Sequence, residues 1–186
     1  QRLNFVIVGG GPSGVELAGA LAEIRKTIVK HEYREMQNER MQIHLVDSNH
    51  AVLAHFSPTA QHLALKYLKE LGVNVIFGQQ VTDFDGATLT FKDGSSMDTN
   101  TVIWAAGVKG LPIPGLETAV DERSQRYRVD GFNRITGSPN IYAIGDIAQS
   151  TADPVWPKGH PQVAPVAIQQ AKHLAKNLTR ANAGEW

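Results

Sequence analysis

The segment "FVIVGGGPSGVELAGALAEI", residues 5–24, determines the fold that the sequence predicts. Residues 5–8 are apolar and mostly β-branched, which is typical of a strand buried on both faces of a parallel sheet. Three glycines follow at the G-x-G-x-x-G spacing, namely Gly9, Gly11 and Gly14. From Pro12 onward the residues favour a helix, with proline near its first position. The segment therefore predicts a strand, a tight turn and a helix whose N-terminus is free to bind phosphate.

Each glycine in this spacing has a separate physical role. The first permits a tight turn, the second lets a pyrophosphate approach the backbone, and the third lets the helix pack closely against the strand. Pro12 and Ser13, at the start of the helix, belong to the same predicted anion site. A glycine-rich turn can also be purely structural, so the rest of the motif has to be found elsewhere in the chain.

The segment "MQIHLVD", residues 41–47, supplies the second strand and ends on an acid, Asp47. Asp47 comes later than the usual offset of about 20 residues, which predicts that the first helix carries a charged extension over Arg25–Arg40. A carboxylate here accepts hydrogen bonds from ribose hydroxyls and repels a 2′-phosphate, by about 4 kcal/mol per unit charge at about 4 Å and a dielectric near 20. The next residues include no arginine, so NAD(H) is favoured over NADP(H). The alternative is a solvated acid at the end of a strand.

The composition excludes several other functions. The 186 residues are 42% hydrophobic, and 18 Lys and Arg balance 18 Asp and Glu, so no charge excess indicates a nucleic-acid partner. The absence of cysteine excludes disulfides, thiolate metal sites and a redox dithiol within these residues. No apolar run approaches the roughly 18 residues of a membrane span. We expect no metal site, because no ligand spacing is formed by His55, His62, His160 and His173.

Residues 57–107 extend the predicted domain. Residues 57–72 form an amphipathic helix that Ser57 or Thr59 caps and Gly72 ends, and residues 73–78 form a third strand. Turn signals at Asp85-Gly86 and Asp93-Gly94 separate three further strand-like segments, which predicts an antiparallel meander that returns into the main sheet. The three segments are "VTDFD", "ATLTF" and "SMDTNTVIWAAG".

A loop rich in glycine and proline, residues 107–115, marks the predicted domain boundary. Beyond it, "YRVD" and "NIYAIGD" are strand-like, and a helix is predicted from about Gln162 to Ala181. The apolar residues of this helix form one stripe, opposite Lys172, Lys176 and Arg180. The predicted domains are residues 1–108 and 109–186.

Four segments in this order resemble the type II, non-proton-pumping NADH:quinone oxidoreductases of the FAD-dependent pyridine nucleotide-disulfide oxidoreductase superfamily. They are "VGGGPSGVELAGALAE", "VIWAAGV", "IYAIGDIA" and "VAPVAIQQAKHLAKNL". The resemblance implies an α/β fold, with a Rossmann-like NADH-binding domain and an antiparallel β-meander in residues 1–108. Residues 109–186 are then the C-terminal part of an incomplete FAD-binding domain.

The same resemblance implies a longer protein. The N-terminal half of the FAD domain is expected before Gln1 and a membrane segment after Trp186, so that the full-length enzyme is peripheral on the cytoplasmic face of the membrane and this fragment is soluble. The implied partners are these missing segments, a quinone substrate and, as an open option, a second copy in a homodimer. We expect the fragment to be inactive and free of flavin.

The resemblance also implies roles for individual residues around the NADH. It implies a pyrophosphate site at Gly9, Gly11, Pro12, Ser13 and Gly14. Asp47 is implied at the adenosine ribose, and Ala106 and Gly107 at a crossover that leaves space beside the dinucleotide. Glu16 is implied near the nicotinamide and the flavin, although an acid here can simply complement the helix dipole.

Further residues are implied on the flavin and quinone side. Gly145 and Asp146 correspond to a site for the ribityl chain of FAD, whereas a plain helix cap is the alternative for Asp146. The quinone motif A-Q-x-A-x-Q falls on Ala164, Ala167 and Gln169, with Pro165 in place of the first glutamine. The alternative is a helix that faces the core and leaves its glutamine exposed.

The implied reaction is hydride transfer from NADH to FAD, followed by electron transfer to a quinone. Because the flavin supplies this chemistry, no firm catalytic residue is predicted, and Glu16 and Gln169 are the candidates. Two alternatives stay open: a soluble FAD/NAD(P)H reductase of the same superfamily, and a non-catalytic NADH-sensing module.

Overall fold

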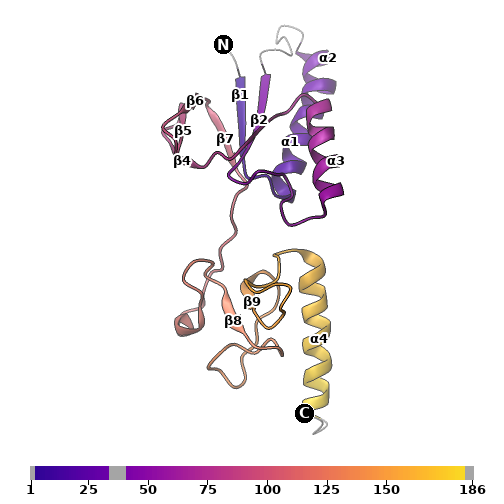
Figure 1. Cartoon of the computed structure of the whole chain (residues 1–186), viewed down its shortest axis with the longest axis vertical. Coiled ribbons are helices and arrows are strands. Elements are labelled where there is room, and N and C mark those ends of the chain that lie inside the picture. Colours follow the sequence, from indigo (N-terminus) through magenta and orange to yellow (C-terminus); the bar gives the residue numbers. More distant parts are fainter. Residues whose placement is uncertain (1–2, 34–40, 183–186) are drawn as a thin grey trace. The chain divides into compact units, whose positions relative to one another are not determined.

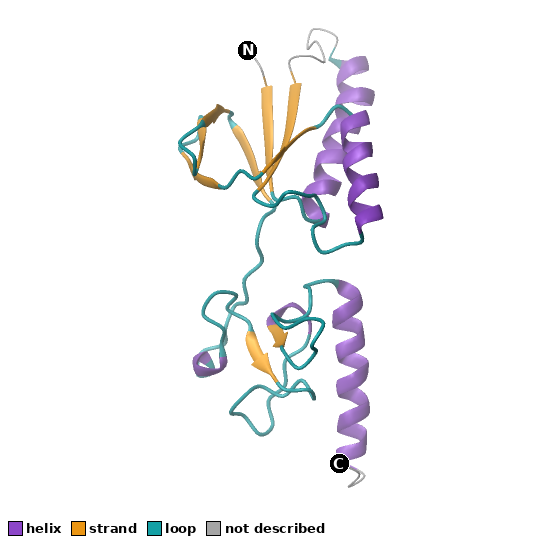
Figure 2. Ribbon diagram, viewed as in Figure 1, coloured by secondary structure: helices purple, strands orange, loops and turns teal. Residues whose placement is uncertain are grey.

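The computed structural model describes residues 3–33 and 41–182, apart from the side chains of Lys30 and Asn182. The chain forms two compact units, Gln1–Gly107 and Val108–Trp186, and each is described separately (Figures 1 and 2).

The first unit contains a four-stranded parallel sheet in the order β3-β2-β1-β7. Its strands are β1 (Leu3–Val8), β2 (Met41–Asp47), β3 (Asn74–Phe77) and β7 (Thr101–Trp104). The central strand β1 is buried on both faces over Val6, Ile7 and Val8, as its apolar run predicted. This order, with helical crossovers from β1 to β2 and from β2 to β3, confirms the predicted Rossmann-like α/β fold.

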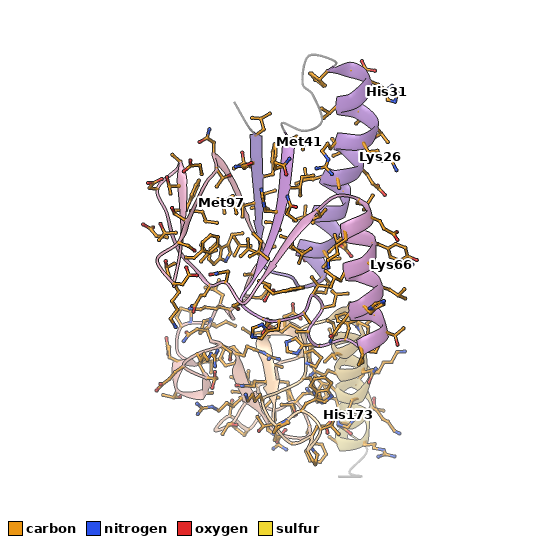
Figure 3. The ribbon with its side chains drawn as sticks, turned by 45° about the horizontal axis from the view of Figure 1, so that its top comes forward. Lys26, His31, Met41, Lys66, Met97 and His173 are labelled. Carbon is orange, nitrogen blue, oxygen red and sulfur yellow. The ribbon has the colours of Figure 1, made fainter. Side chains whose placement is uncertain are left out.

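Helices cover one face of this sheet (Figure 1). They are α1 (Pro12–Ile24), the π-helix η1 (Arg25–Val29), α2 (Lys30–Glu32) and α3 (Pro58–Glu70). The predicted extension of the first helix is therefore helical to Glu32, and its part over residues 34–40 lies outside the described residues. Arg25 fixes the start of this extension, because its guanidinium donates to Leu71 O at 2.7 Å and Met41 O at 3.1 Å. Lys26, His31 and Lys66 project from the helices (Figure 3).

Helix α3 has the predicted ends. The Ser57 hydroxyl accepts a hydrogen bond from Ala60 N at 3.3 Å, and Pro58 occupies the first turn. Thr59, the alternative cap, lies inside the helix. Gly72 adopts a φ of +76°, which ends the helix.

Three short strands pack on the other face of the sheet. β4 (Val81–Phe84), β5 (Thr88–Phe91) and β6 (Ser96–Asp98) form an antiparallel sheet in this order. Leu89 and Phe91 bury their side chains with Val6, Val8 and Val46 of the parallel sheet. The meander is therefore confirmed.

The last predicted strand of the meander, residues 96–107, is wrong as one element. It divides into β6 and β7, which belong to different sheets. The buried Thr99 hydroxyl donates to Asn4 O at 2.7 Å and accepts from Thr101 N at 3.1 Å, and these contacts turn the chain between the two strands. A continuous alternation of apolar residues does not show where a strand leaves one sheet for another.

Half-buried His44 in β2 makes the stability of the first unit depend on pH. Burial lowers the pKa of His44 below its ordinary value, so below pH 6.5 the unfolded chain binds more protons than the folded chain. We expect the melting temperature to fall as the pH is lowered from about 7.5 to about 5.5. His44→Gln should reduce this dependence, measured by circular dichroism at several pH values. His62→Gln, on the exposed face of α3, is the control. If the melting temperatures of both variants change equally with pH, this role of His44 is contradicted.

The second unit has little regular strand structure. β8 (Tyr127–Val129) and β9 (Ala148–Ser150) form a parallel pair, and a small core surrounds them. Two single-turn 3₁₀ helices, η3 (Glu117–Ala119) and η4 (Gly145–Ile147), precede the long helix α4 (Ala164–Asn182). The predicted C-terminal helix is therefore confirmed, with its start at Ala164.

The predicted strand "NIYAIGD" is wrong. Within residues 140–146, Tyr142 forms a single antiparallel bridge with Arg134, and the chain then enters η4, which contains Asp146. Gly145 has a φ of +70° and donates its N–H to the Gln170 side chain, so it leaves the strand conformation. The strand of this region, β9, begins two residues after Asp146.

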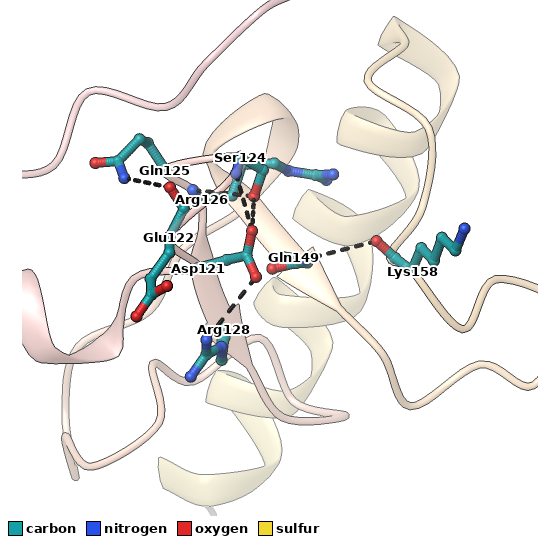
Figure 4. A network of polar contacts seen from close by, with 8 residues as sticks. All are labelled: Asp121, Glu122, Ser124, Gln125, Arg126, Arg128, Gln149 and Lys158. Carbon is teal, nitrogen blue, oxygen red and sulfur yellow. Dashed lines mark hydrogen bonds and ion pairs between the residues drawn. The ribbon is translucent and has the colours of Figure 1, made fainter.

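Figure 4 shows a polar network in which the Asp121 carboxylate accepts from Ser124 and pairs with Arg128. The neighbouring Arg126 is only 6% exposed, and its Nη2 donates to the carbonyls of Ala148 and, at 3.1 Å, His160. Burial lowers the pKa of Arg126, whereas the carboxylates of Asp146 and Asp121 favour its charged form. Arg126 thereby ties β9 to the segment that leads into α4.

Candidate functional site

The glycine-rich turn of the first unit lies between β1 and α1. Gly9 has a φ of +115°, and a Cβ atom on it would lie 2.7 Å from Ala106 N. A Cβ atom on Gly14 would overlap the carbonyl oxygen of Gly9, because the first turn of α1 packs directly on the loop. Both positions therefore require glycine for the fold itself.

Gly11 differs from these two glycines. A Cβ atom on it would meet no atom within 4 Å, so the space beside its backbone is open. Gly11 is the N-cap of α1 in an extended conformation, and Pro12 follows at the first helical position. The first N–H groups of a helix lack intrahelical partners and lie at its positive end. The open turn at Gly11 can therefore accept an anionic group such as a pyrophosphate.

Backbone hydrogen bonds hold this turn from three sides. Gly9 N donates to Val46 O of β2 at 2.8 Å, and Ala105 N donates to Val8 O at 2.8 Å. Leu53 N donates to Gly10 O at 2.7 Å. Leu53 has a φ of +51°, an unfavourable conformation for a branched side chain. The turn is thus preorganised before any ligand binds.

Asp47 lies at the end of β2, beside the turn. One carboxylate oxygen accepts from Gly10 N, and the other accepts from Asn49 N at 2.6 Å and from Asn49 Nδ2 at 2.9 Å. These donors orient the carboxylate, which has about four acceptor positions and keeps one free for a ribose hydroxyl. The sequence motif identified Asp47, but it did not show that Asp47 also binds the glycine turn.

The segment after β7 completes this edge of the sheet. Ala106 lies against Gly9, and Gly107 has a φ of +74°. Trp104 Nε1 donates to Ala106 O at 2.7 Å and so fixes the segment. Glu16 lies further along α1, with its side chain exposed. The structure thus brings the glycines, Asp47 and Ala106 together. Sequence reasoning missed the contacts of Leu53, Asn49 and Trp104. Trp104 lies in the segment "VIWAAGV", but nothing in that segment shows its hydrogen bond to Ala106.

In the second unit, the predicted flavin-side and quinone-side residues lie around η4 and the start of α4. Gly145 N donates to Gln170 Oε1 at 2.7 Å, and Gln162 Nε2 donates to Asp146 O at 3.1 Å. The side chain of Asp146 is exposed. Gln170, which the sequence did not single out, therefore connects α4 to this turn.

The predicted quinone motif lies on the first turns of α4. Gln169 is exposed, whereas the next residue, Gln170, is buried. Ala167 is half-buried and would lie 3.5 Å from a Cβ atom on Gly145, and Ala164 is exposed. These positions leave the Gln169 side chain accessible to a ligand.

Within residues 3–33 and 41–182, no cluster of three or more His, Cys, Asp or Glu side chains has the arrangement of a metal site. None of the helices in the same ranges is long and apolar enough to cross a membrane.

A family comparison matches nearly the whole chain. The model of the pyridine nucleotide-disulphide oxidoreductase family matches residues 1–171. Among curated proteins, the chain is 32% identical over 192 residues to the type II NADH:quinone oxidoreductase Ndh of Mycobacterium tuberculosis, covering 99% of the chain and 40% of that protein. It is 32% identical over 185 residues to the type II NADH:quinone oxidoreductase of Haemophilus influenzae, covering 96% of the chain and 40% of that protein. The chain thus spans about two fifths of these relatives' length.

Two solved structures are also similar to this chain. The chain superposes on NDH2 of Plasmodium falciparum, solved in complex with NADH, with a TM-score of 0.70 and 25% identity, covering 81% of the chain and 32% of that protein. A ferredoxin reductase of Rhodopseudomonas palustris has a TM-score of 0.67 at 20% identity, covering 96% of the chain and 41% of that protein. The second match shows the fold alone.

Proposed function

Because the chain belongs to the pyridine nucleotide-disulphide oxidoreductase family, we propose that its first unit binds NADH and that the chain is part of a type II NADH:quinone oxidoreductase. The observation that carries this proposal is the open turn at Gly11 beside the oriented carboxylate of Asp47. The relatives named type II NADH:quinone oxidoreductases match over nearly the whole chain and support the same function.

In this proposal the first unit positions the dinucleotide. The N–H groups around Gly11 and the N-terminus of α1 bind the pyrophosphate, and Asp47 accepts from the adenosine ribose. Gly9 packs closely against Ala106 at the carboxyl ends of the strands. The dinucleotide is proposed to lie across this edge, where ligands of such sheets bind. Glu16 stays a candidate for a position near the nicotinamide.

The second unit is proposed to contribute to the flavin and quinone sites. FAD, when bound, accepts a hydride from NADH and passes the electrons on. The residues fit this cofactor, because the exposed Asp146 carboxylate is free to accept from a ribityl hydroxyl and Gln170 fixes the adjacent Gly145. Gln169, with Ala164 and Ala167, is proposed on the quinone side. The longer protein would then act at the membrane surface, and NADH oxidation with a quinone acceptor would distinguish it from a soluble reductase or an NADH sensor.

The first test of this function is nucleotide selectivity. We expect the chain to bind NADH at least about tenfold more tightly than NADPH, because the Asp47 carboxylate repels a 2′-phosphate and solvent screens part of this repulsion. Isothermal titration calorimetry with both nucleotides measures the ratio. Asp47→Asn should bring the two affinities closer together by removing the charge.

Asp98→Asn is the matched control, because it removes one carboxylate charge in β6 and leaves Asp47 intact. It should keep the ratio of the two affinities. Equal affinities in the unmodified chain would contradict the role of Asp47, and an absence of binding for both nucleotides would contradict the proposed function.

A further inference from the structure

Asn49 contacts Asp47 in a way that the dinucleotide motif does not specify. Its backbone N–H and its side-chain Nδ2 both donate to one oxygen of the Asp47 carboxylate, Oδ1, at 2.6 Å and 2.9 Å. The other oxygen, Oδ2, accepts from Gly10 N. A carboxylate oxygen has about two acceptor positions, so the two donors from Asn49 occupy both positions of Oδ1. The acceptor position that remains belongs to Oδ2, beside the glycine turn.

The backbone of Asn49 is itself fixed by the segment that follows β3. Gly78 N donates to Asn49 O at 3.1 Å, and Gln79 N donates to Asp47 O at 3.2 Å. Gly78 has a φ of +70°, and a Cβ atom on it would lie 3.2 Å from His50 Cε1, so the two loops pack closely. The protein therefore sets the position of Asn49 before a ligand binds.

The side chain of Asn49 is exposed and keeps one polar atom for a ligand. Its Nδ2 donates to Asp47, and its Oδ1, the other atom of the same amide group, only accepts hydrogen bonds. An adenosine ribose has two adjacent hydroxyl groups, whereas Asp47 has one acceptor position free. The second hydroxyl needs another acceptor, and Asn49 Oδ1 supplies one next to the carboxylate.

We propose that Asn49 is a specificity-determining residue: Asp47 Oδ2 accepts from one hydroxyl of the adenosine ribose and Asn49 Oδ1 accepts from the other. This role rests on the proposed binding of NADH to the first unit. A 2′-phosphate is ionised at neutral pH and carries acceptor oxygens, so it would face the acceptors of both side chains. Residues 48–57 and 78–80 contain no lysine or arginine to bind that phosphate. Asn49 therefore strengthens the selection of NADH over NADPH.

Calorimetry with NADH and NADPH on the full chain measures this selection. Asn49→Ala removes the side-chain amide and keeps the backbone contacts. We expect it to raise the NADH dissociation constant about tenfold and to lower the preference for NADH about fivefold. A general loss of stability would instead weaken both nucleotides alike and leave the preference unchanged.

Two further variants provide the rescue and the control. Asn49→Ser should recover part of the preference, because a serine two residues after an aspartate can donate to the same carboxylate oxygen, as Ser95 Oγ does to Asp93 Oδ1 at 2.6 Å. Asn74→Ala removes an asparagine side chain of the same unit, whose Nδ2 donates to Gln42 Oε1 at 3.1 Å. It should leave both dissociation constants unchanged.

The direct contact with the ribose is tested with 2′-deoxy-NADH and 3′-deoxy-NADH. The unmodified chain should bind each analogue about tenfold more weakly than NADH, because each lacks one hydroxyl. Asn49→Ala should bind one of them as tightly as it binds NADH, since the missing hydroxyl no longer has a partner in this variant. The role of Asn49 is overturned, and NADH binding is not, if both analogues stay about tenfold weaker in Asn49→Ala or if its preference for NADH is unchanged. If the unmodified chain binds no NADH, the proposed function and the role of Asn49 are both overturned.

Discussion

Gly14→Ala should abolish NADH binding and destabilise the first unit by about 3 kcal/mol or more, because the new methyl group has no room. Its carbon would overlap the Gly9 carbonyl oxygen, and the backbone here is fixed by two hydrogen bonds, from Gly9 N to Val46 O and from Ala105 N to Val8 O. Relief requires α1 to move away from the turn, which displaces the N–H groups proposed to bind pyrophosphate. Urea unfolding monitored by circular dichroism gives the stability, and calorimetry gives the NADH affinity.

Two further glycines provide matched controls for this substitution. Gly19 lies inside α1, and a Cβ atom on it would meet nothing within 4 Å, so Gly19→Ala should stabilise the helix by about 0.5–1 kcal/mol. Gly11→Ala should leave stability nearly unchanged and weaken NADH binding, because its methyl group would enter the open space proposed for the pyrophosphate. A Gly11→Ala variant that binds NADH as tightly as the unmodified chain would place the pyrophosphate elsewhere.

The fold of the first unit could be predicted well because its signals are local. The apolar run of residues 5–8, the glycine spacing and the caps of α3 each act within a few residues, and the structure contains the elements that they predict. The division between β6 and β7 could not be predicted, because it depends on the contact of Thr99 with Asn4, more than ninety residues away in sequence.

The second unit was predicted less well for the same physical reason. Residues 140–146 alternate like a strand, yet Gly145 gives its N–H to Gln170, and this long-range bond determines the local conformation. The quinone motif predicted a role for Gln169. In the structure the neighbouring Gln170 is the buried glutamine, and it accepts the hydrogen bond from Gly145. Neighbouring glutamines on a helix point in different directions, and which of them faces the body of the unit depends on tertiary packing.

At the candidate site, too, some residues could be identified from local sequence and others only from tertiary contacts. Gly9, Gly11, Gly14 and Asp47 follow a motif whose spacing reflects the chemistry of a dinucleotide, so the sequence was enough to propose them. The contacts that orient this site come from Leu53, Asn49 and Trp104, whose residue types carry no such signal. Their contribution becomes visible only when the carboxyl ends of the strands are brought together.

Arg126→Met should destabilise the second unit by about 3 kcal/mol, because it removes a buried donor and leaves the carbonyls of Ala148 and His160 without it. Met fills much of the same volume, so the loss reports on hydrogen bonding more than on packing. Arg126→Lys should restore only part of the stability, since a single ammonium group lacks the planar fork of a guanidinium. Hydrogen exchange of the Tyr127 and Val129 amides in β8 measures the effect, with the β1 amides as the internal reference.

Arg123→Met removes the same charge at an exposed position and should change exchange little. If both methionine variants exchange alike, the stability of this unit does not depend on the Arg126 contacts, and its small core around Tyr127 and Ala148 is enough to hold β8 against β9.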